Sequence, residues 1–305
     1  MDRPPADEML HVRLRLPAGY VETAIWLLQE EGWGAALAEE TWPAGLLDGE
    51  KPPSRPEAEL VLIAAVGREE ALRRRIEELA RACGWGPAAW SMAIERRRRE
   101  DWESLWRRRW RPFRCAGFVV HAAFHDPASL PLRPGDQPLR IAAGSAFGTG
   151  GHASTRMALR SLRRWAERRP LGRVLDLGTG SGILAVAAAL LGAERVAGMD
   201  PDPASAVQAR AAAEANGVEA VCRFWRGGLE TAGGVWDTVL ANLHSDLIAE
   251  NAAVLAARTA RGGRLFTGGI LDRKEATTFS ALEECGFRLV QAGGRGRWRC
   301  GEWRL

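Results

Sequence analysis

The sequence is poor in lysine, has few cysteines, and contains no long apolar run. Lys51 and Lys274 are its only lysines, so arginine supplies nearly all of the positive charge. Its five cysteines are scattered, with no C-x-x-C pair and no histidine at ligand spacing, which argues against a zinc motif and predicts reduced thiols. No run of about 18 apolar residues occurs, and the first residues are polar. We therefore expect no membrane span, no signal peptide and no metal site, and we predict a cytoplasmic protein.

Length and hydrophobic content predict a folded protein with more than one domain. A chain of 305 residues suggests two domains, and a hydrophobic content of 46% is ample for packed cores. The formal net charge of +4 is mildly basic. Because the preference for arginine over lysine indicates a genome-wide compositional bias, this charge identifies no partner.

The N-terminal part predicts a ferredoxin-like α+β domain. Apolar and polar residues alternate as in strands, or recur with helical spacing, in six successive segments. The expected elements are a strand at 9–16, a helix at 20–31, strands at 35–42 and 59–66, a helix at 69–83 and a strand at 89–95. This β-α-β-β-α-β order is the ferredoxin-like pattern. It breaks at the arginine run that begins at Arg96, so we expect a first domain over residues 1–97.

A linker helix is expected next, over residues 98–112. Trp102, Trp106 and Trp110 recur every four residues and form one stripe, while the arginines between them face away. One interpretation is a basic and aromatic nucleic-acid surface. The other is a helix whose stripe docks on a neighbouring domain while its arginines are solvated. We favour the second, because no recognisable RNA-binding module accompanies the helix.

The rest of the chain is organised around a strand, a glycine turn and a helix. Residues 173–177 predict a buried strand, and an apolar helix is expected at 183–191. Three glycines at alternate positions separate them: Gly178, Gly180 and Gly182. Glycine lets the backbone turn tightly and leaves no Cβ between the main chain and a ligand. The arrangement is typical of the first unit of a nucleotide-binding α/β sheet.

The strand that follows, at 195–200, ends in an acid. Asp200 lies 22 residues after Gly178, about where such folds place the carboxylate that binds the ribose hydroxyls. Dinucleotide sites carry a third glycine where this sequence has Ile183. The G-x-G-x-G spacing, preceded by Asp176, instead favours S-adenosylmethionine as the cofactor and argues against a nicotinamide oxidoreductase.

Strands and helices alternate from here to the C-terminus. Short strands at 118–124 and 139–141 come before the glycine turn; after it, helices are expected at 203–214, 246–257 and 273–285, and strands at 220–225, 236–243, 263–267, 287–291 and 296–305. The last strand has no helix after it, so the sheet closes with a β-hairpin, the methyltransferase variant of the Rossmann plan. We predict an α/β domain with a Rossmann-like seven-stranded sheet over residues 113–305.

A second glycine-rich loop, at 146–155, precedes a helix expected at 156–167. Gly148 and Gly150 can bring backbone amides close to a ligand. Ser154 or Thr155 can cap the helix or reach the same ligand.

Several segments resemble the ribosomal protein L11 methyltransferase family, also called PrmA. They are Ala146-Phe-Gly-Thr-Gly-Gly-His-Ala-Ser-Thr155, Val174-Leu-Asp-Leu-Gly-Thr-Gly-Ser-Gly-Ile-Leu-Ala185, Gly198-Met-Asp-Pro-Asp-Pro203, Ala241-Asn242-Leu243 and Gly268-Gly-Ile-Leu271. The resemblance implies that Thr155, Gly178, Asp200 and Asn242 contact S-adenosylmethionine, alongside Gly180 of the glycine turn. It also implies that the N-terminal domain holds the ribosomal protein. Loop residues such as Gly151 and Thr179 depart from the family pattern.

Asn242, at the end of a predicted strand, is the candidate residue for orienting the methyl acceptor. Only a neutral amine can attack a methyl group, and the reference pKa of lysine is about 10.4. Desolvation beside a sulfonium disfavours the ammonium form, so no dedicated base is required. Asn242 can accept a hydrogen bond from an amine N–H. Leu243-His244-Ser245 follows it, where adenine and glutamine methyltransferases would have Pro-Pro-aromatic. We interpret His244 as a helix-start residue in preference to a proton acceptor.

The residues and the resemblance together predict an S-adenosylmethionine-dependent protein N-methyltransferase. Its expected substrate is a large-subunit ribosomal protein, L11, free or on the ribosome, modified on lysine and as a further candidate on its N-terminal amine. Methylation of another protein lysine, or of RNA, stays open as an alternative. We expect a monomer without direct nucleic-acid recognition.

Overall fold

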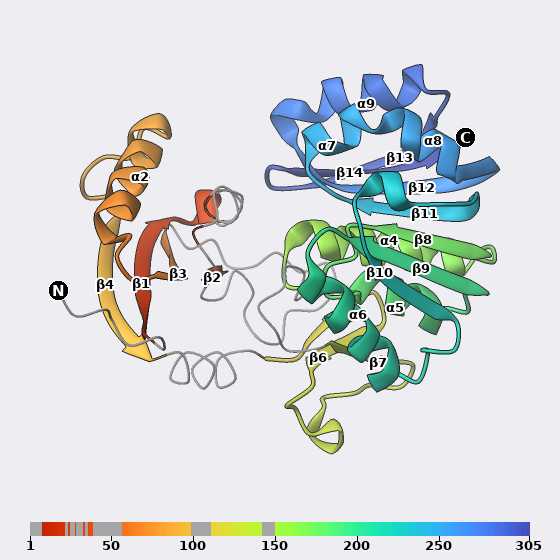
Figure 1. The fold of residues 1–305 in the computed structure, drawn as a ribbon, viewed down its shortest axis with the longest axis horizontal. Coiled ribbons are helices and arrows are strands. Elements are labelled where there is room, and N and C mark those ends of the chain that lie inside the picture. Colours follow the sequence, from red (N-terminus) through yellow and green to blue (C-terminus); the bar gives the residue numbers. More distant parts are fainter. Residues whose placement is uncertain are drawn as a thin grey trace. The chain divides into compact units, whose positions relative to one another are not determined.

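The computed structural model describes residues 8–21, 24, 28, 33, 36–38, 57–98, 111–141 and 150–305. The chain divides into two compact units, Met1–Arg111 and Pro112–Leu305 (Figure 1). The predicted linker helix falls mainly on residues 99–110, and these, like residues 142–149 of the second glycine-rich loop, lie outside the described residues.

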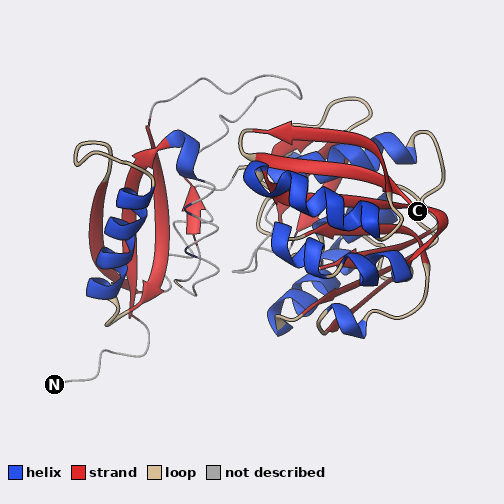
Figure 2. Ribbon diagram, turned by 90° about the horizontal axis from the view of Figure 1, so that it is seen from above, coloured by secondary structure: helices blue, strands red, loops and turns tan. Residues whose placement is uncertain are grey.

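An antiparallel sheet with strand order β2-β3-β1-β4 forms the first unit. Its elements are β1 (Glu8–Pro17), the 3-10 helix η1 (Ala18–Tyr20), β2 (Ala36–Ala38), β3 (Glu57–Ala65), α2 (Glu69–Ala82) and β4 (Ser91–Arg98). Alternate residues of β1 such as Leu10 and Leu14 are buried against Leu72 and Ile76 of α2, and Figure 2 shows α2 lying along one face of the sheet. The strand order is that of the predicted ferredoxin-like pattern.

The last strand of this sheet is longer than predicted. β4 continues through the arginine run, and β1 pairs with it as far as Glu8 opposite Arg98. The predicted break at Arg96 is therefore wrong. The arginines are tolerated because β4 is an edge strand, where their side chains reach solvent. Arg96 pairs with Glu69 at 3.0 Å and Arg97 with Glu95 at 2.6 Å.

A seven-stranded sheet with order β10-β9-β8-β11-β12-β14-β13 is the centre of the second unit. Its strands are β8 (Arg173–Leu177), β9 (Arg195–Asp200), β10 (Cys222–Arg226), β11 (Trp236–Asn242), β12 (Thr259–Leu271), β13 (Arg288–Arg295) and β14 (Trp298–Arg304). β14 runs antiparallel to both of its neighbours, β12 and β13, and the other pairs in the sheet are parallel. The predicted Rossmann-like sheet closed by a β-hairpin is thus confirmed.

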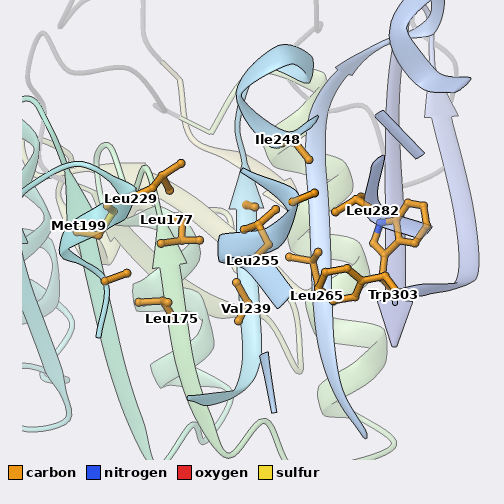
Figure 3. Close-up of a cluster of buried hydrophobic side chains, with 14 of the residues drawn as sticks. Leu175, Leu177, Met199, Leu229, Val239, Ile248, Leu255, Leu265, Leu282 and Trp303 are labelled. Carbon is orange, nitrogen blue, oxygen red and sulfur yellow. The ribbon is translucent and has the colours of Figure 1, made fainter. Parts of the chain in front are cut away.

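Helices cover both faces of this sheet (Figures 1 and 2). They are α4 (Ala153–Ala166), α5 (Ile183–Leu190), α6 (Pro203–Ala215), the 3-10 helix η3 (Leu229–Thr231), α7 (Ser245–Glu250), α8 (Ala252–Arg258), η4 (Asp272–Lys274) and α9 (Glu275–Glu284). One core lies between the sheet and helices α7 to α9. There Leu175, Leu265 and Trp303 of the strands meet Leu255 and Leu282 of the helices (Figure 3).

A small sheet, β5-β6-β7, precedes α4. Its strands are β5 (Phe113–Cys115), β6 (Phe118–Ala122) and β7 (Gln137–Ile141), with the 3-10 helix η2 (Pro127–Ser129) between the last two. Asn216, which follows α6, bonds to both backbone groups of Arg140 in β7, at 2.9 and 2.6 Å. The small sheet is thereby fixed to the helix layer.

Two predicted elements differ in detail. The helix expected at 246–257 is two helices, because Asn251 leaves the helical conformation with φ −108° and ψ 16°. The strand expected at 263–267 is the longer β12, whose pairing with β14 shifts register between Thr267 and Ile270. Among the described residues no helix is long and apolar enough to cross a membrane, and no cluster of side chains able to hold a metal ion is found.

Candidate active site

The candidate site lies where β8, β9 and β11 end, beside the start of α4. Parallel α/β sheets bind ligands outside the carboxyl ends of their strands. The site residues predicted from the sequence lie in this region in two groups. Gly180 and Asp200 bond to each other, and Thr155 and Asn242 bond to each other.

The glycine turn between β8 and α5 needs glycine for its backbone and for its contacts. Gly178, Gly180 and Gly182 have φ of 68°, 53° and 79°, which side-chain-bearing residues rarely adopt. A Cβ on Gly178 would overlap the Leu243 side chain, and one on Gly182 would lie 2.8 Å from Ala209. Gly178 therefore gives Leu243 room at the end of β11, and Gly182 lets α5 pack on α6.

The Asp200 carboxylate is held in place by two backbone amides. Its Oδ2 accepts from Gly180 N–H at 2.9 Å and its Oδ1 from Asp202 N–H at 3.0 Å. Asp202 in turn caps α6 by accepting from Ala204 N–H at 2.9 Å. Each carboxylate oxygen keeps a further acceptor position. The partly exposed group can therefore accept hydrogen bonds from a ligand's hydroxyls without moving.

Asp176, near the end of β8, carries a buried carboxyl group. The sequence identified it only as the acid that precedes the G-x-G-x-G motif. It is 1% exposed and accepts from Thr179 Oγ1 at 2.7 Å. Burial raises the pKa of this carboxyl to about 7, and repulsion from Asp200 adds to the rise, against the opposing bond from Thr179. Nothing in the local sequence signals this, because it follows from how the sheet and α5 enclose the side chain.

Thr155 and Asn242 meet although they are far apart in the chain. Asn242 Nδ2 donates to Thr155 Oγ1 at 3.4 Å. Thr155 is in the first turn of α4 and is 1% exposed. Asn242 Oδ1 is buried and has no hydrogen-bond partner in the described part of the chain.

The cap of α4 is His152, so of the two roles considered for Ser154 and Thr155, capping the helix or reaching a ligand, the structure does not assign them the first. His152 Nδ1 accepts from Ser154 N–H at 3.3 Å and lies 2.7 Å from Ser154 Oγ. Burial lowers the pKa of His152 to about 4, with a contribution from nearby His244, so the ring is neutral at pH 7. The rings of His152 and the buried Trp298 pack edge to face, with their centroids 4.7 Å apart. Neither His152 nor Trp298 was assigned a role from the sequence; the only signal was a histidine directly after glycines.

The segment after Asn242 is fastened to β12. His244 lies at the start of α7, as predicted. Ser245 Oγ accepts from Leu271 N–H at 2.9 Å. Gly269, with φ of 75°, lies so close to the Leu243 carbonyl that a side chain there would overlap it. These contacts hold the segment at the end of β11 against β12, in a chain that lacks the Pro-Pro-aromatic sequence expected of adenine and glutamine methyltransferases.

Comparison with known proteins gives consistent results. The family described as "Ribosomal protein L11 methyltransferase (PrmA)" matches residues 8–304. A protein named ribosomal protein L11 methyltransferase from Pelotomaculum thermopropionicum is 34% identical over 307 residues, covering 95% of this chain and 97% of its own. One of the same name from Thermus thermophilus is 41% identical over 201 residues, 65% of this chain and 75% of its own. A crystal structure of the ribosomal protein L11 methylase from Lactobacillus delbrueckii is similar with a TM-score of 0.56 and 28% identity, covering 61% of this chain and 94% of that one.

Proposed function

The chain belongs to the ribosomal protein L11 methyltransferase (PrmA) family, and from this premise we propose that it methylates ribosomal protein L11 on lysine side chains and, as a second acceptor, on the N-terminal amine. Membership makes it an S-adenosylmethionine-dependent methyltransferase, which confirms the predicted family, enzyme class and cofactor. The observation that carries the substrate proposal is the family match from residue 8 to 304, because it spans both compact units.

The residues at the ends of β8 and β9 fit the cofactor. Gly178 and Gly180 supply the left-handed backbone of the turn, and the anchored Asp200 carboxylate has acceptor positions for ribose hydroxyls. We assign Gly178, Gly180 and Asp200 to cofactor binding. Thr155 and Asn242 complete the set of cofactor-binding residues. When bound, S-adenosylmethionine supplies an electrophilic methyl group on a sulfonium.

Asn242 is the residue we assign to the acceptor amine. A neutral primary amine has two N–H donors and one lone pair, and an acceptor for one N–H directs the lone pair away from it. Asn242 Oδ1, which has no hydrogen-bond partner among the described residues, is the acceptor we assign to this role. Holding the two reactants in line can supply about 7–11 kcal/mol of the barrier reduction, without a strong base. The neutral state of His152 adds no positive charge next to the site.

We assign substrate recognition to the N-terminal unit, expected from the sequence over residues 1–97, with 98–112 as the linker. A ferredoxin-like sheet offers one face or an edge to a partner, and no residue of the candidate site comes from it. We propose that the enzyme acts as a monomer in the cytoplasm, where its substrate is made, on L11 either free or on the ribosome.

One labelling experiment tests the substrate. The full chain is incubated with tritiated S-adenosylmethionine and ribosomes from cells that lack this activity, and in parallel with free L11. We expect label on L11, at lysines and the N-terminus by mass spectrometry. Label on ribosomal RNA, or on a different protein, would contradict the proposal.

A further inference from the structure

Leu243, the residue after Asn242, is held between two glycines from other segments. Its side chain lies against Gly178 of the glycine turn, where a Cβ would overlap Leu243 Cδ2. Its backbone carbonyl lies against Gly269 of β12, where a Cβ would overlap the carbonyl oxygen. The two glycines have φ of 68° and 75°, a conformation that strains any side chain. Neither position therefore readily takes a residue that would push Leu243 aside.

This contact places Leu243 between the cofactor side and the acceptor side of the site. The strands β9, β8 and β11 are successive neighbours in the sheet. Asp200, assigned to the ribose, ends β9, and Asn242, assigned to the acceptor, ends β11. A cofactor bound at Asp200 and Gly178 therefore extends its sulfonium end toward β11. Leu243 contacts the glycine turn between these two strands and is only partly buried, so its side chain borders this end of the site.

We propose that the side chain of Leu243 sets the room in front of the reactive methyl group, and thereby the number of methyl groups that one acceptor amine receives. This inference rests on the proposed function, because it concerns the amine that the same site methylates. In each transfer the nitrogen lone pair bonds to the methyl carbon while the C–S bond breaks and its electron pair stays on sulfur. A proton then leaves the nitrogen to solvent before the next transfer.

The acceptor becomes bulkier with each transfer, whereas the wall of the site stays the same. One methylene group more or less in an apolar pocket changes discrimination by about tenfold or more. The missing Cβ of Gly178 lets the Leu243 side chain lie against the turn, which leaves space on the acceptor side for the amine. Phenylalanine at this position would fill part of that space, and alanine would enlarge it.

The room in front of the methyl group can be measured by calorimetry without an acceptor. S-adenosylethionine carries an ethyl group where S-adenosylmethionine carries methyl. We expect Leu243→Phe to weaken binding of the ethyl compound about tenfold more than binding of S-adenosylmethionine, and Leu243→Ala to shift the ratio of the two affinities in the opposite direction. Leu247→Phe is the matched control, because Leu247 lies on α7 with 37% exposure and its enlargement should leave the ratio unchanged. The same ratio in wild type and both Leu243 variants would overturn the proposal.

Mass spectrometry of the product gives a second readout. Wild type and variants are run to completion on L11 with excess S-adenosylmethionine, and the methyl groups on each modified amine are counted. We expect Leu243→Phe to stop at fewer methyl groups than wild type, and the volume-conserving Leu243→Met to keep the wild-type count. A change that only destabilised the protein would slow every transfer and leave the final count unchanged. An unchanged count from Leu243→Phe on fully labelled L11 would therefore also overturn the proposal.

The two readouts separate this inference from the proposed function. No label on L11 from the wild-type enzyme would contradict the substrate proposal, and the comparison of ethyl and methyl compounds would still decide the role of Leu243. Label on L11 together with an unchanged affinity ratio would contradict the role of Leu243 alone. If Leu243→Phe does not bind S-adenosylhomocysteine, which carries neither group, the variant is misfolded, and the affinity ratio of Leu243→Ala then decides.

Discussion

Replacing Asp176 by asparagine should remove a pH dependence from the stability of the catalytic unit. The Asp176 carboxyl is fully buried, and its pKa rises from 3.8 to about 7 in the folded protein. Asparagine resembles the protonated acid in size and can still accept from Thr179 Oγ1. The variant therefore keeps the hydrogen bond and loses the titration.

The sign and size of the effect follow from this pKa. In the folded state Asp176 keeps its proton up to about pH 7, whereas the unfolded chain releases it near pH 4. Between these values the unfolded state binds fewer protons, so the stability from this group is complete below pH 4 and is lost as pH rises through 7. At about 1.4 kcal/mol for each pKa unit, the whole loss is about 4 kcal/mol, and the part between pH 5 and pH 8 is about 2.5 kcal/mol.

Urea unfolding of wild type and Asp176→Asn, at pH 5 and at pH 8, measures this directly. Other groups titrate equally in both proteins, so the difference between the two unfolding free energies isolates Asp176. We expect the variant to gain about 2.5 kcal/mol relative to wild type on going from pH 5 to pH 8. A difference that is the same at both pH values would show that the burial argument is wrong.

Three further outcomes follow from the site. Asp200→Ala should weaken S-adenosylmethionine binding roughly tenfold or more, because charge-assisted hydrogen bonds are worth about 1.5–3 kcal/mol each; unchanged affinity by calorimetry in a folded variant would remove Asp200 from the site. Gly178→Ala should lower activity, because the left-handed backbone at 178 strains any side chain and Leu243 must also move. Leu243→Ala should restore only part of the loss; full restoration would show that the strain is unimportant. A chain starting at Pro112 should bind S-adenosylmethionine by calorimetry but not methylate L11; normal methylation would leave the N-terminal unit without its proposed role.

The sequence was sufficient to predict elements whose structure is determined by residues adjacent in the chain. The glycine turn after β8 and the acid at the end of β9 were found because a strand, glycines at alternate positions and a helix follow each other directly. The ferredoxin-like order was found in the same way from alternation and helical spacing. The arginines at the end of β4 were misread, because the local sequence does not show that β4 lies at the edge of its sheet, where Arg96 is exposed and pairs with Glu69 of α2.

The contacts that define the candidate site were not predictable in this way. Thr155 bonds to Asn242, 87 residues away, and His152 packs on Trp298 from the last strand. From the sequence, Thr155 and Asn242 were expected to lie in one site only because the family resemblance implies it. A third segment also lies against this pair, since Gly268 of β12 is the residue that pairs with Asn242 in the sheet.

Asp176 links stability to cofactor binding, and the two should change with pH in opposite directions. The buried carboxyl is costly to ionise in the folded chain, and Asp200 adds to that cost. The sulfonium of the cofactor is positive, and a positive charge brought into the site that Asp200 borders would favour the ionised form of Asp176 and lower its pKa. Cofactor affinity should therefore rise between about pH 6 and pH 8, with proton release on binding, in the range where stability falls. Calorimetry in two buffers of different ionisation enthalpy measures the released proton. Asp176→Asn should bind without this release; equal proton release from wild type and variant would show that another group titrates.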